Sequence, residues 1–364
     1  MLEIYLPIVQ VHVDIFLLLF LSLLVGVLSG LFGVGGGFLM TPFLIFMGIP
    51  PVYAVPNEVN NILATSVSGS LTHWFKNTLD YKMGFMIMCG GIAGTAAGMM
   101  TFSYFSDIGK ISTIISLLYM NLLAIVGTLM LVDTFRESRK KEKVKKKLHE
   151  HNWFQGLPFR MRFPKSRLYE SALTPIFLGL IVGFVASMMG IGGAFLMVPA
   201  MIYIVGMPVK LIPGTSLFVT IFISTIVTVL HAFNYGSIDL FLVIPLIFGS
   251  IVGVQLGQKL GQYVDGTQLK SLFALLLCSV AVAIAYDSFL RDKTEFNVTQ
   301  VIKTDLNSLA EFSLKFNNEA PFLYGALAIL LAILLGALTA WARKIISDLR
   351  KNKPKKEEVK FPSK

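Results

Sequence analysis

The chain has 364 residues, of which 55% are hydrophobic and 14% are charged, and its mean hydropathy is +0.72. A soluble domain carries about 25% charged residues, and a soluble fold of this length needs far more polar surface than this sequence supplies. The composition therefore excludes an ordinary soluble enzyme, a disordered protein and a collagen-like fibre, and it predicts a polytopic membrane protein.

The net charge of +10 is confined to two blocks. Residues 133–170 hold 12 basic and 5 acidic residues, residues 343–364 hold 9 and 3, and the rest of the chain is slightly negative. Both blocks follow long apolar runs, which is typical of cytoplasmic segments under the positive-inside rule. We therefore expect anionic lipid headgroups to contact the loop and the tail, and we expect no nucleic-acid partner.

Apolar runs long enough to cross a bilayer, which takes about 20 residues, follow one another along the chain. They cover 14–47, 57–75, 83–103, 110–132, 171–206, 212–234, 238–260, 268–289 and 322–342. The runs 14–47 and 171–206 are too long for one straight crossing. Each contains a glycine cluster, which predicts a broken helix; the clusters are Gly33, Gly35, Gly36 and Gly37, and Gly190, Gly192 and Gly193.

The basic blocks also constrain the number of crossings. If both are cytoplasmic, the chain between them crosses the membrane an even number of times, and the four ordinary spans between 212 and 342 already satisfy this. The run 171–206 must then return to the side it entered, and by analogy so must 14–47. We therefore expect a multi-pass protein of the cell (inner) membrane, with its N-terminus outside and its C-terminus in the cytoplasm.

The two halves of the chain are similar in sequence. GLFGVGGGFLMTPFLIFMGIPP at 30–51 matches SMMGIGGAFLMVPAMIYIVGMP at 187–208, at an offset of 157. With the count of crossings, this predicts an all-α polytopic membrane protein made of two inverted-topology repeats. Each repeat has a Gly-broken hairpin and three transmembrane helices, and one extra transmembrane helix follows at the C-terminal side. Many secondary transporters share this architecture and bind substrate at broken helices near the midplane.

The expected organisation follows from these runs and charges. It comprises a first membrane repeat over 1–132, a basic cytoplasmic loop over 133–170, a second membrane repeat over 171–289, an extracytoplasmic segment over 290–321, an extra transmembrane helix over 322–342 and a basic cytoplasmic tail over 343–364.

The duplicated G-x-G-G-G/A-F-L-x-x-P element and the sequence PGTSL at 213–217 carry a family resemblance. The chain resembles the TauE/SafE family of sulfite and organosulfonate exporters over about 14–132 and 171–289. The resemblance implies a membrane transporter, with sulfite or an organosulfonate as the substrate.

The glycines are the first candidate binding residues. Breaking a helix at Gly33, Gly35, Gly36 and Gly37, and again at Gly190, Gly192 and Gly193, frees backbone N–H groups at the positive end of a helix dipole. Two such helix ends facing each other would bind a small anion through their backbone N–H groups, without a formally charged side chain. The alternative is that small residues simply allow close helix packing.

Polar residues after the broken helices are the second candidates. They are Asn57, Asn60 and Asn61 in the first half and Thr215 and Ser216 in the second. Amides and hydroxyls donate hydrogen bonds to an oxyanion, but they also cap helix N-termini after a proline turn, and both interpretations stay open.

Three titratable groups are candidates for proton coupling. Glu58 either carries a proton, favours a cationic substrate, or lies at the exposed mouth as an N-terminal helix acid, which we expect. His73 and His231 occupy matched places near the ends of their spans, where a histidine commonly hydrogen-bonds to backbone.

Other functions compete with that of an anion exporter. Glu58, and the absence of Thr-Ser at the first-half position that matches Thr215 and Ser216, favour an ion-coupled carrier of an organic acid or a cation. A membrane assembly protein does not need an inverted repeat. The sequence has no HExxH, P-loop, GxSxG or CxxC pattern, so we expect no enzyme activity, no metal and no cofactor.

Overall fold

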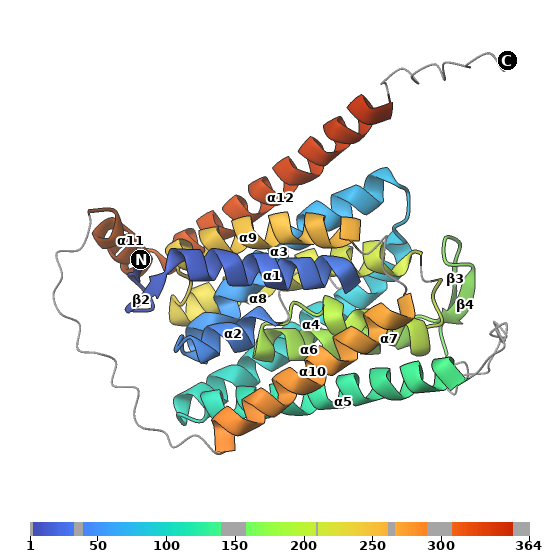
Figure 1. Ribbon diagram of the computed structural model, residues 1–364, viewed down its shortest axis with the longest axis horizontal. Helices are drawn as coiled ribbons and strands as arrows, with labels where there is room; N and C mark the ends of the chain where they lie inside the picture. The colour runs from blue at the N-terminus through green and yellow to red at the C-terminus, as the bar shows by residue number, and fades with distance from the viewer. Residues whose placement is uncertain are drawn as a thin grey trace, which may run out of the picture.

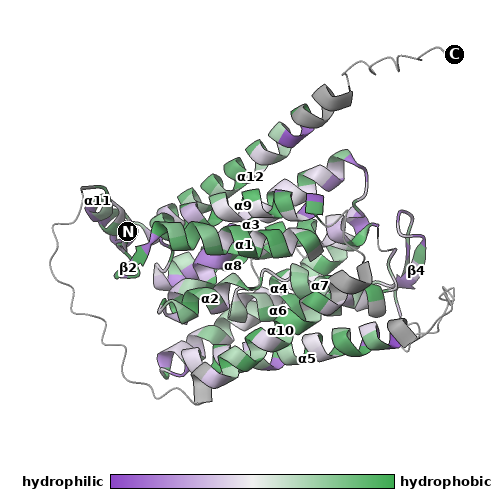
Figure 2. Cartoon of the chain, viewed as in Figure 1, coloured by the Kyte–Doolittle hydropathy of each residue, from purple (hydrophilic) through white to green (hydrophobic). Residues whose placement is uncertain are grey.

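The computed structural model describes residues 3–32, 39–139, 158–208, 210–260, 266–289 and 308–351. These residues form 12 helices and two short hairpins, so the chain is mostly helical. The helices lie side by side in one bundle (Figure 1). Hydrophobic residues dominate the length of the bundle, and hydrophilic residues gather toward its ends (Figure 2). The first glycine cluster, residues 140–157 and 290–307, and the tail beyond residue 351 lie outside the described residues.

The first half runs from two strands into five helices. Its elements are β1 (Glu3–Leu6), β2 (Val11–Asp14), α1 (Ile15–Phe32), α2 (Met40–Phe46), α3 (Pro51–Phe75), α4 (Tyr81–Asp107) and α5 (Ile111–Arg139).

The second half has the same order of elements, followed by two more helices. These are β3 (Arg160–Phe163), β4 (Leu168–Ser171), α6 (Leu173–Met189), α7 (Ala194–Tyr203), α8 (Ile212–Tyr235), α9 (Leu240–Leu260), α10 (Gly266–Phe289), α11 (Ser308–Glu319) and α12 (Pro321–Lys351).

The two antiparallel hairpins correct the expectation of an all-α chain. In β1–β2, Glu3 pairs with Asp14, and in β3–β4, Arg160 pairs with Ser171. The hairpins match position by position at the same offset of 157 residues that relates the glycine elements. Strands of four residues beside long apolar runs give too short an alternation to be recognised in the sequence.

Both over-length runs are broken as predicted, into α1 and α2 and into α6 and α7. In the second break, Gly190, Gly192 and Gly193 have φ values of +73°, +69° and +80°. L-residues with a side chain rarely adopt this left-handed conformation, whereas glycine adopts it at little cost. The glycines therefore determine where α6 ends and α7 begins.

Among the residues that the structure describes, five helices are long and apolar enough to cross a bilayer: α4, α5, α8, α9 and α12. Helices α1 and α6 and part of α10 are shorter apolar segments. Helix α3 has 25 residues, but it carries a run of buried polar side chains that lowers its hydropathy.

Two helix pairs join the halves through glycine contacts. A Cβ added at Gly30 of α1 would lie 2.3 Å from the Val254 carbonyl oxygen of α9, and one added at Gly94 of α4 would lie 2.0 Å from the Leu180 carbonyl oxygen of α6. Residue numbers rise together along α1 and α9, because Gly26 lies against Gly253 and Gly30 lies against Val254. Helices α1 and α9 therefore run parallel, and α4 and α6 are related in the same way.

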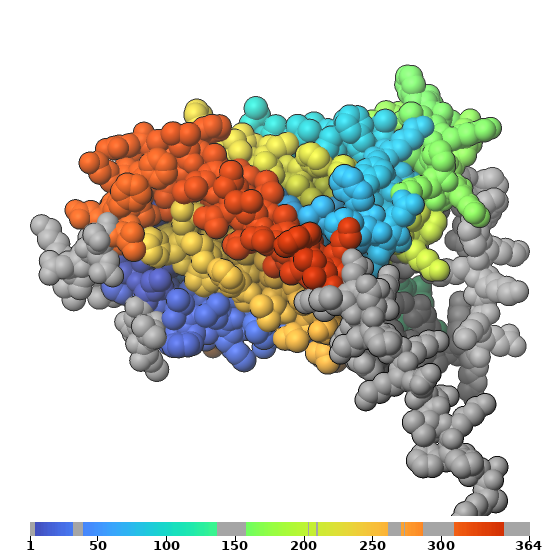
Figure 3. Space-filling view, turned by 90° about the horizontal axis from the view of Figure 1, so that it is seen from above, coloured from blue at the N-terminus to red at the C-terminus, as the bar shows by residue number. Residues whose placement is uncertain are grey.

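Helices α3 and α8 form the central contact between the halves, and they run antiparallel. Gly69 lies against Leu217, whereas His73, further along α3, lies against Gly214, which comes earlier on α8. Helix α12 packs on α3 and α9 and crosses one face of the molecule (Figure 3). The Arg343 guanidinium on α12 donates to Gln258 of α9 at 2.9 Å.

The two ends of the bundle are distinguished by their hairpins. The β1 end carries β1–β2, the α8–α9 turn and α11, whose Asn317 donates to the Gly236 carbonyl oxygen at 2.8 Å. The β3 end carries β3–β4, the α3–α4 turn and the last part of the apolar stretch of α12, where Lys344 lies 4.4 Å from the Phe75 ring centroid.

Candidate functional site

Helix α3 carries a polar run, Asn57, Glu58, Asn60 and Asn61, and the structure leaves none of these side chains exposed. The helix begins at Pro51, with proline in its first turn, so the run occupies the second and third turns. A capping side chain must stand at the first position before the helix. The reading of these residues as N-caps is therefore wrong, because α3 starts earlier than its polar run.

Glu58 is fully buried, which corrects the expectation that it lies at an exposed mouth. The Asn61 amide nitrogen donates to both Glu58 carboxylate oxygens at 3.2 Å and lies 3.0 Å from Ser250 Oγ on α9. Within the described part of the chain, no basic side chain forms an ion pair with Glu58. An unpaired buried carboxylate costs several kcal/mol, so this site calls for a proton or a cation.

Asn57 is fully engaged in holding two elements together. Its amide nitrogen donates to the carbonyl oxygens of Tyr53 at 2.7 Å and Ser237 at 3.0 Å. Its Oδ1 accepts from the backbone N–H of Asp239 at 2.7 Å. Asn57 thus ties α3 to the α8–α9 turn.

Thr215 and Ser216 make comparable contacts near the start of α8. Thr215 Oγ1 donates to the Leu211 carbonyl oxygen at 2.8 Å and accepts from the backbone N–H of Asp80 at 3.0 Å. Ser216 donates to the Pro213 carbonyl oxygen at 3.1 Å. These hydroxyls stabilise a helix start and a turn.

Asn60 differs from its neighbours because neither its nitrogen nor its oxygen has a hydrogen-bond partner among the residues that the structure describes. The Oδ1 of Asn61 also lacks one. Leaving a buried polar atom unpaired costs about 1–3 kcal/mol. A ligand that supplies the missing partners would recover this cost, so Asn60 is a binding candidate.

The second glycine break packs against this part of α3. A Cβ at Gly190 would lie 3.0 Å from Val55 Cα, and one at Gly192 would lie 2.4 Å from Ile62 Cγ2. Gly193 is the N-cap residue of α7. The N-terminal, positive end of α7 therefore lies beside the stretch of α3 that holds the polar run.

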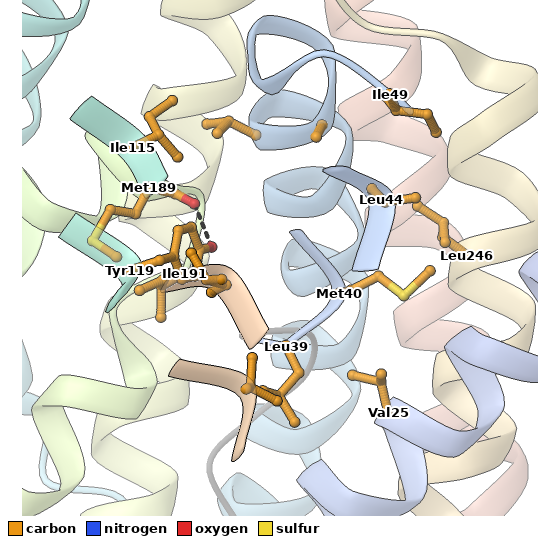
Figure 4. Packing of buried hydrophobic residues seen from close by; sticks show 14 of the residues in the cluster. Val25, Leu39, Met40, Leu44, Ile49, Ile115, Tyr119, Met189, Ile191 and Leu246 are labelled. Atoms are coloured by element: carbon orange, nitrogen blue, oxygen red, sulfur yellow. Dashed lines mark hydrogen bonds between the residues drawn. The ribbon is translucent and has the colours of Figure 1, made fainter. Parts of the chain in front are cut away.

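Two side chains from other helices hold the end of α6 just before the break. The Tyr119 hydroxyl of α5 donates to the Met189 carbonyl oxygen at 2.6 Å, next to Ile191 (Figure 4). The His231 Nε2 of α8 lies 3.3 Å from the Ser187 carbonyl oxygen. His231 is fully buried, so its contact with backbone is as expected but is not interfacial, and its Nδ1 has no partner in the described chain.

His73 lies elsewhere. It belongs to the last turn of α3, is half-buried, and its Nδ1 lies 2.9 Å from Thr78 Oγ1. At 1.5 Å per residue, His73 is about 22 Å along the helix from Glu58. The structure therefore brings Glu58, His231 and the second glycine break to one region, and His73 to the β3 end.

Gly33, Gly35, Gly36 and Gly37 fall outside the described residues, but the residues that follow them are placed. Leu39 and Met40 at the start of α2 belong to the same buried cluster as Met189, Tyr119 and Ile191 (Figure 4). The start of α2 and the second break are thus close together in the core.

A groove of about 460 Å³ runs along α6 and α7, and its lining residues are apolar except for Thr174. Phe177 and Ile181, which line it, are 58% and 46% exposed, so the groove faces the surroundings of the bundle. It offers no polar group to an anion and is separate from the polar run of α3.

Ser250 and Tyr119 were missed as site residues by sequence reasoning. Ser250 lies in the glycine-rich segment 249–261, and its 189-residue separation from Asn61 leaves no local signal of their contact. Tyr119 is one of several aromatic residues in apolar helices. Only the fold distinguishes these two.

Comparison with known proteins gives the family. The family model of the sulfite exporter TauE/SafE matches residues 18–284, most of the chain. The chain belongs to the TauE/SafE family. It is therefore a multi-pass membrane transporter, and its match includes both glycine elements and the polar run of α3.

Several proteins described as probable membrane transporters are also similar to this chain. The probable membrane transporter protein YjnA of Bacillus subtilis is 29% identical over 71% of this chain and 95% of its own length. The probable membrane transporter protein YunE of the same organism is 24% identical over 74% and 97%. A probable membrane transporter protein of Xylella fastidiosa is 25% identical over 73% and 93%. No solved structure matches the chain.

Proposed function

We propose that this TauE/SafE member is a secondary transporter that exports a small anion, sulfite or an organosulfonate. The observation that carries the proposal is the packing of the Gly190–Gly193 break against the stretch of α3 that holds the polar run. A helix N-terminus contributes about 0.3–1 kcal/mol to anion binding, and about 2 kcal/mol when it is partly buried. Such a site binds an anion loosely enough to release it.

The proposed architecture is a pair of repeats in inverted topology. Helix α1 runs parallel to α9, and α4 runs parallel to α6, whereas α3 and α8 are antiparallel. Since short turns join α3 to α4 and α8 to α9, these directions support opposite orientations for α1 and α6. The starts of α2 and α7 then approach the same region from opposite sides, as in other transporters with inverted repeats.

We further propose that the β3 end is cytoplasmic, which puts the N-terminus outside and the C-terminus inside. Lys82, Lys165 and Lys344 lie at this end, and Lys165 donates to the Leu79 carbonyl oxygen at 2.9 Å. Positive-inside counting supports this orientation.

Glu58 supports proton coupling. An ionised Glu58 beside the polar run would repel an anion, and no basic side chain in the described chain neutralises it. If Glu58 binds a proton when the anion binds, the site holds one negative charge instead of two. Less net charge is then buried while the anion crosses the membrane. The same buried carboxyl favours the second candidate function, an ion-coupled carrier of an organic acid or cation.

The test is flux in proteoliposomes with sulfite, sulfate, taurine and a dicarboxylate under an imposed pH gradient. Sulfite or taurine flux that depends on the gradient supports anion export. Dicarboxylate flux alone supports the second candidate, and an absence of flux for every anion contradicts the proposal. A Gly193→Val variant that inserts into the membrane serves as the inactive control.

A further inference from the structure

Asp239, in the α8–α9 turn, is fully buried and binds the tip of the first hairpin. Its Oδ2 accepts from the backbone N–H of Ile8 at 2.9 Å and of Val9 at 3.4 Å. Its own backbone N–H donates to Asn57 of α3. The β1 end is therefore closed by a hairpin whose tip binds one buried carboxylate, while its residues Leu6, Val9 and Val13 pack in the buried apolar cluster.

Asp80, in the α3–α4 turn, makes the matching contacts at the β3 end. Its Oδ2 accepts from the backbone N–H of Ser166, at 3.1 Å, and from the Ser166 hydroxyl at the tip of the second hairpin. Its backbone N–H donates to Thr215 of α8. Asp80 is 2% exposed, so it is buried in the same way.

The two arrangements are equivalent under the internal repeat. Val9 and Ser166 are 157 residues apart, like every paired position of the two hairpins. In both cases the hairpin precedes the first helix of one half, and the aspartate belongs to the other half. Each carboxylate is thus a contact between the halves, and the two contacts lie at opposite ends of the bundle.

We propose that Asp80 and Asp239 are positioning residues of two gates, which open alternately during transport. This inference rests on the proposed transport function. Each hairpin has two strands, too few to be stable alone, so it depends on its contacts with the bundle, and the aspartate is the contact at its tip. Each hairpin tip donates two hydrogen bonds to its aspartate, few enough for the motion of a transporter to break and restore.

The alternation follows from where the halves touch. Helices α3 and α8 cross the centre of the molecule, and they supply Asn57 to the Asp239 contact and Thr215 to the Asp80 contact. Rocking one half against the other about this pair separates the halves at one end and presses them together at the other. The structure has both contacts formed, which makes it the closed state.

Thiol labelling tests the gates without a substrate. In a background lacking Cys89 and Cys278, the reporter variants Ser237→Cys and Leu79→Cys place a thiol at matched, fully buried positions beside the two aspartates. A membrane-impermeant maleimide would be applied to protein in nanodiscs, where both ends are accessible.

Asp239→Ala is expected to raise the labelling rate at position 237 at least fivefold and to lower it at position 79. Asp80→Ala is expected to do the reverse. A purely structural role would loosen only the local end. If either variant raises labelling at its own end without lowering it at the other, or changes neither, the proposal is wrong.

Milder variants keep the test valid if the alanine variants fail to fold. Asp239→Asn retains a side-chain acceptor, and Ser166→Ala removes one donor while leaving Asp80 and the backbone intact. Each is expected to give the same reciprocal pattern with a smaller change. Reciprocal labelling in a protein that moves none of the tested anions would support the gates and contradict the substrate assignment, so the two failures are distinguishable.

Discussion

The amide nitrogen of Asn61 is equidistant, at 3.2 Å, from the two carboxylate oxygens of Glu58. One amide group, with two hydrogens, thus faces three acceptors, since Ser250 Oγ is also within 3.0 Å. The donors available to the carboxylate are too few to balance a negative charge that is shielded from water. The site is therefore suited to a carboxyl group that gains and loses a proton.

Replacing Glu58 with Gln should remove the response to a pH gradient. Glutamine keeps the shape and the contact with Asn61 but cannot ionise. In proteoliposomes, anion flux through the wild-type chain should change at least fivefold when the gradient is reversed, and flux through Glu58→Gln should change less than twofold. Asn61→Asp is a useful comparison, because it adds a second acid beside the first. A variant at Glu58 that keeps the full pH response would exclude this residue as the proton carrier.

The glycine break can be tested with two glycines that have nearly the same backbone conformation. Gly192 has φ +69° and Gly206 has φ +68°, so alanine at either position costs about 1–2 kcal/mol of left-handed strain. A Cβ at Gly192 would lie 2.4 Å from Ile62, whereas nothing lies within 4 Å of one at Gly206.

Gly192→Ala should therefore reduce transport at least tenfold, because α7 must move away from α3. Gly206→Ala should retain most of the flux, and both proteins should be recovered from the membrane in similar amounts. Equal loss of transport in the two variants would show that strain alone, and not the approach to α3, explains the effect.

The broken helices were predictable because two signals agreed. The runs 14–47 and 171–206 exceed the thickness of a bilayer, and each contains glycines at one point. The start of α3 was not recognised. The run 57–75 predicts a helix that begins at residue 57, whereas Pro51 occupies the first turn of α3 and Pro56 lies inside it.

That shift of about two turns changed the meaning of the polar run. It moved Glu58 from a supposed mouth to a fully buried position and turned Asn57 into a tie to the α8–α9 turn. The partner of Glu58 was identifiable as a near neighbour, since Asn61 is three residues away. Contacts with Ser250 and Asp239 join positions about 180 residues apart, and no local pattern in a single sequence indicates such pairs.

The glycine-rich helices should be sensitive to size only on their inner face. A Cβ at Gly94 would lie 2.0 Å from the Leu180 carbonyl oxygen, while the neighbouring Ala93 is exposed. Gly94→Val should separate α4 from α6 and lower stability by about 1–3 kcal/mol. Ala93→Val should leave the midpoint of thermal unfolding in detergent nearly unchanged. Similar midpoints for the two variants would argue against close packing of these helices.

The hairpin contact at the β1 end should depend on pH. Burial raises the pKa of Asp239 to about 6, although the backbone N–H groups of Ile8 and Phe241 oppose this shift. When the hairpin is undocked, Asp239 is exposed to water and its pKa is lower. The docked form therefore binds a proton more tightly, so lowering the pH through 6 favours docking and raising it favours release.

A spin label at the exposed tip residue Gln10, introduced as Gln10→Cys, measures this equilibrium. Its mobile fraction should rise between about pH 5 and pH 7, and Asp239→Asn should abolish the rise. The hairpin's own titratable groups, Glu3, His12 and Asp14, remain in that variant, as does Tyr324, which faces Asp239 from α12. A pH response that survives Asp239→Asn would have to come from one of these groups, and the assignment to Asp239 would then be wrong.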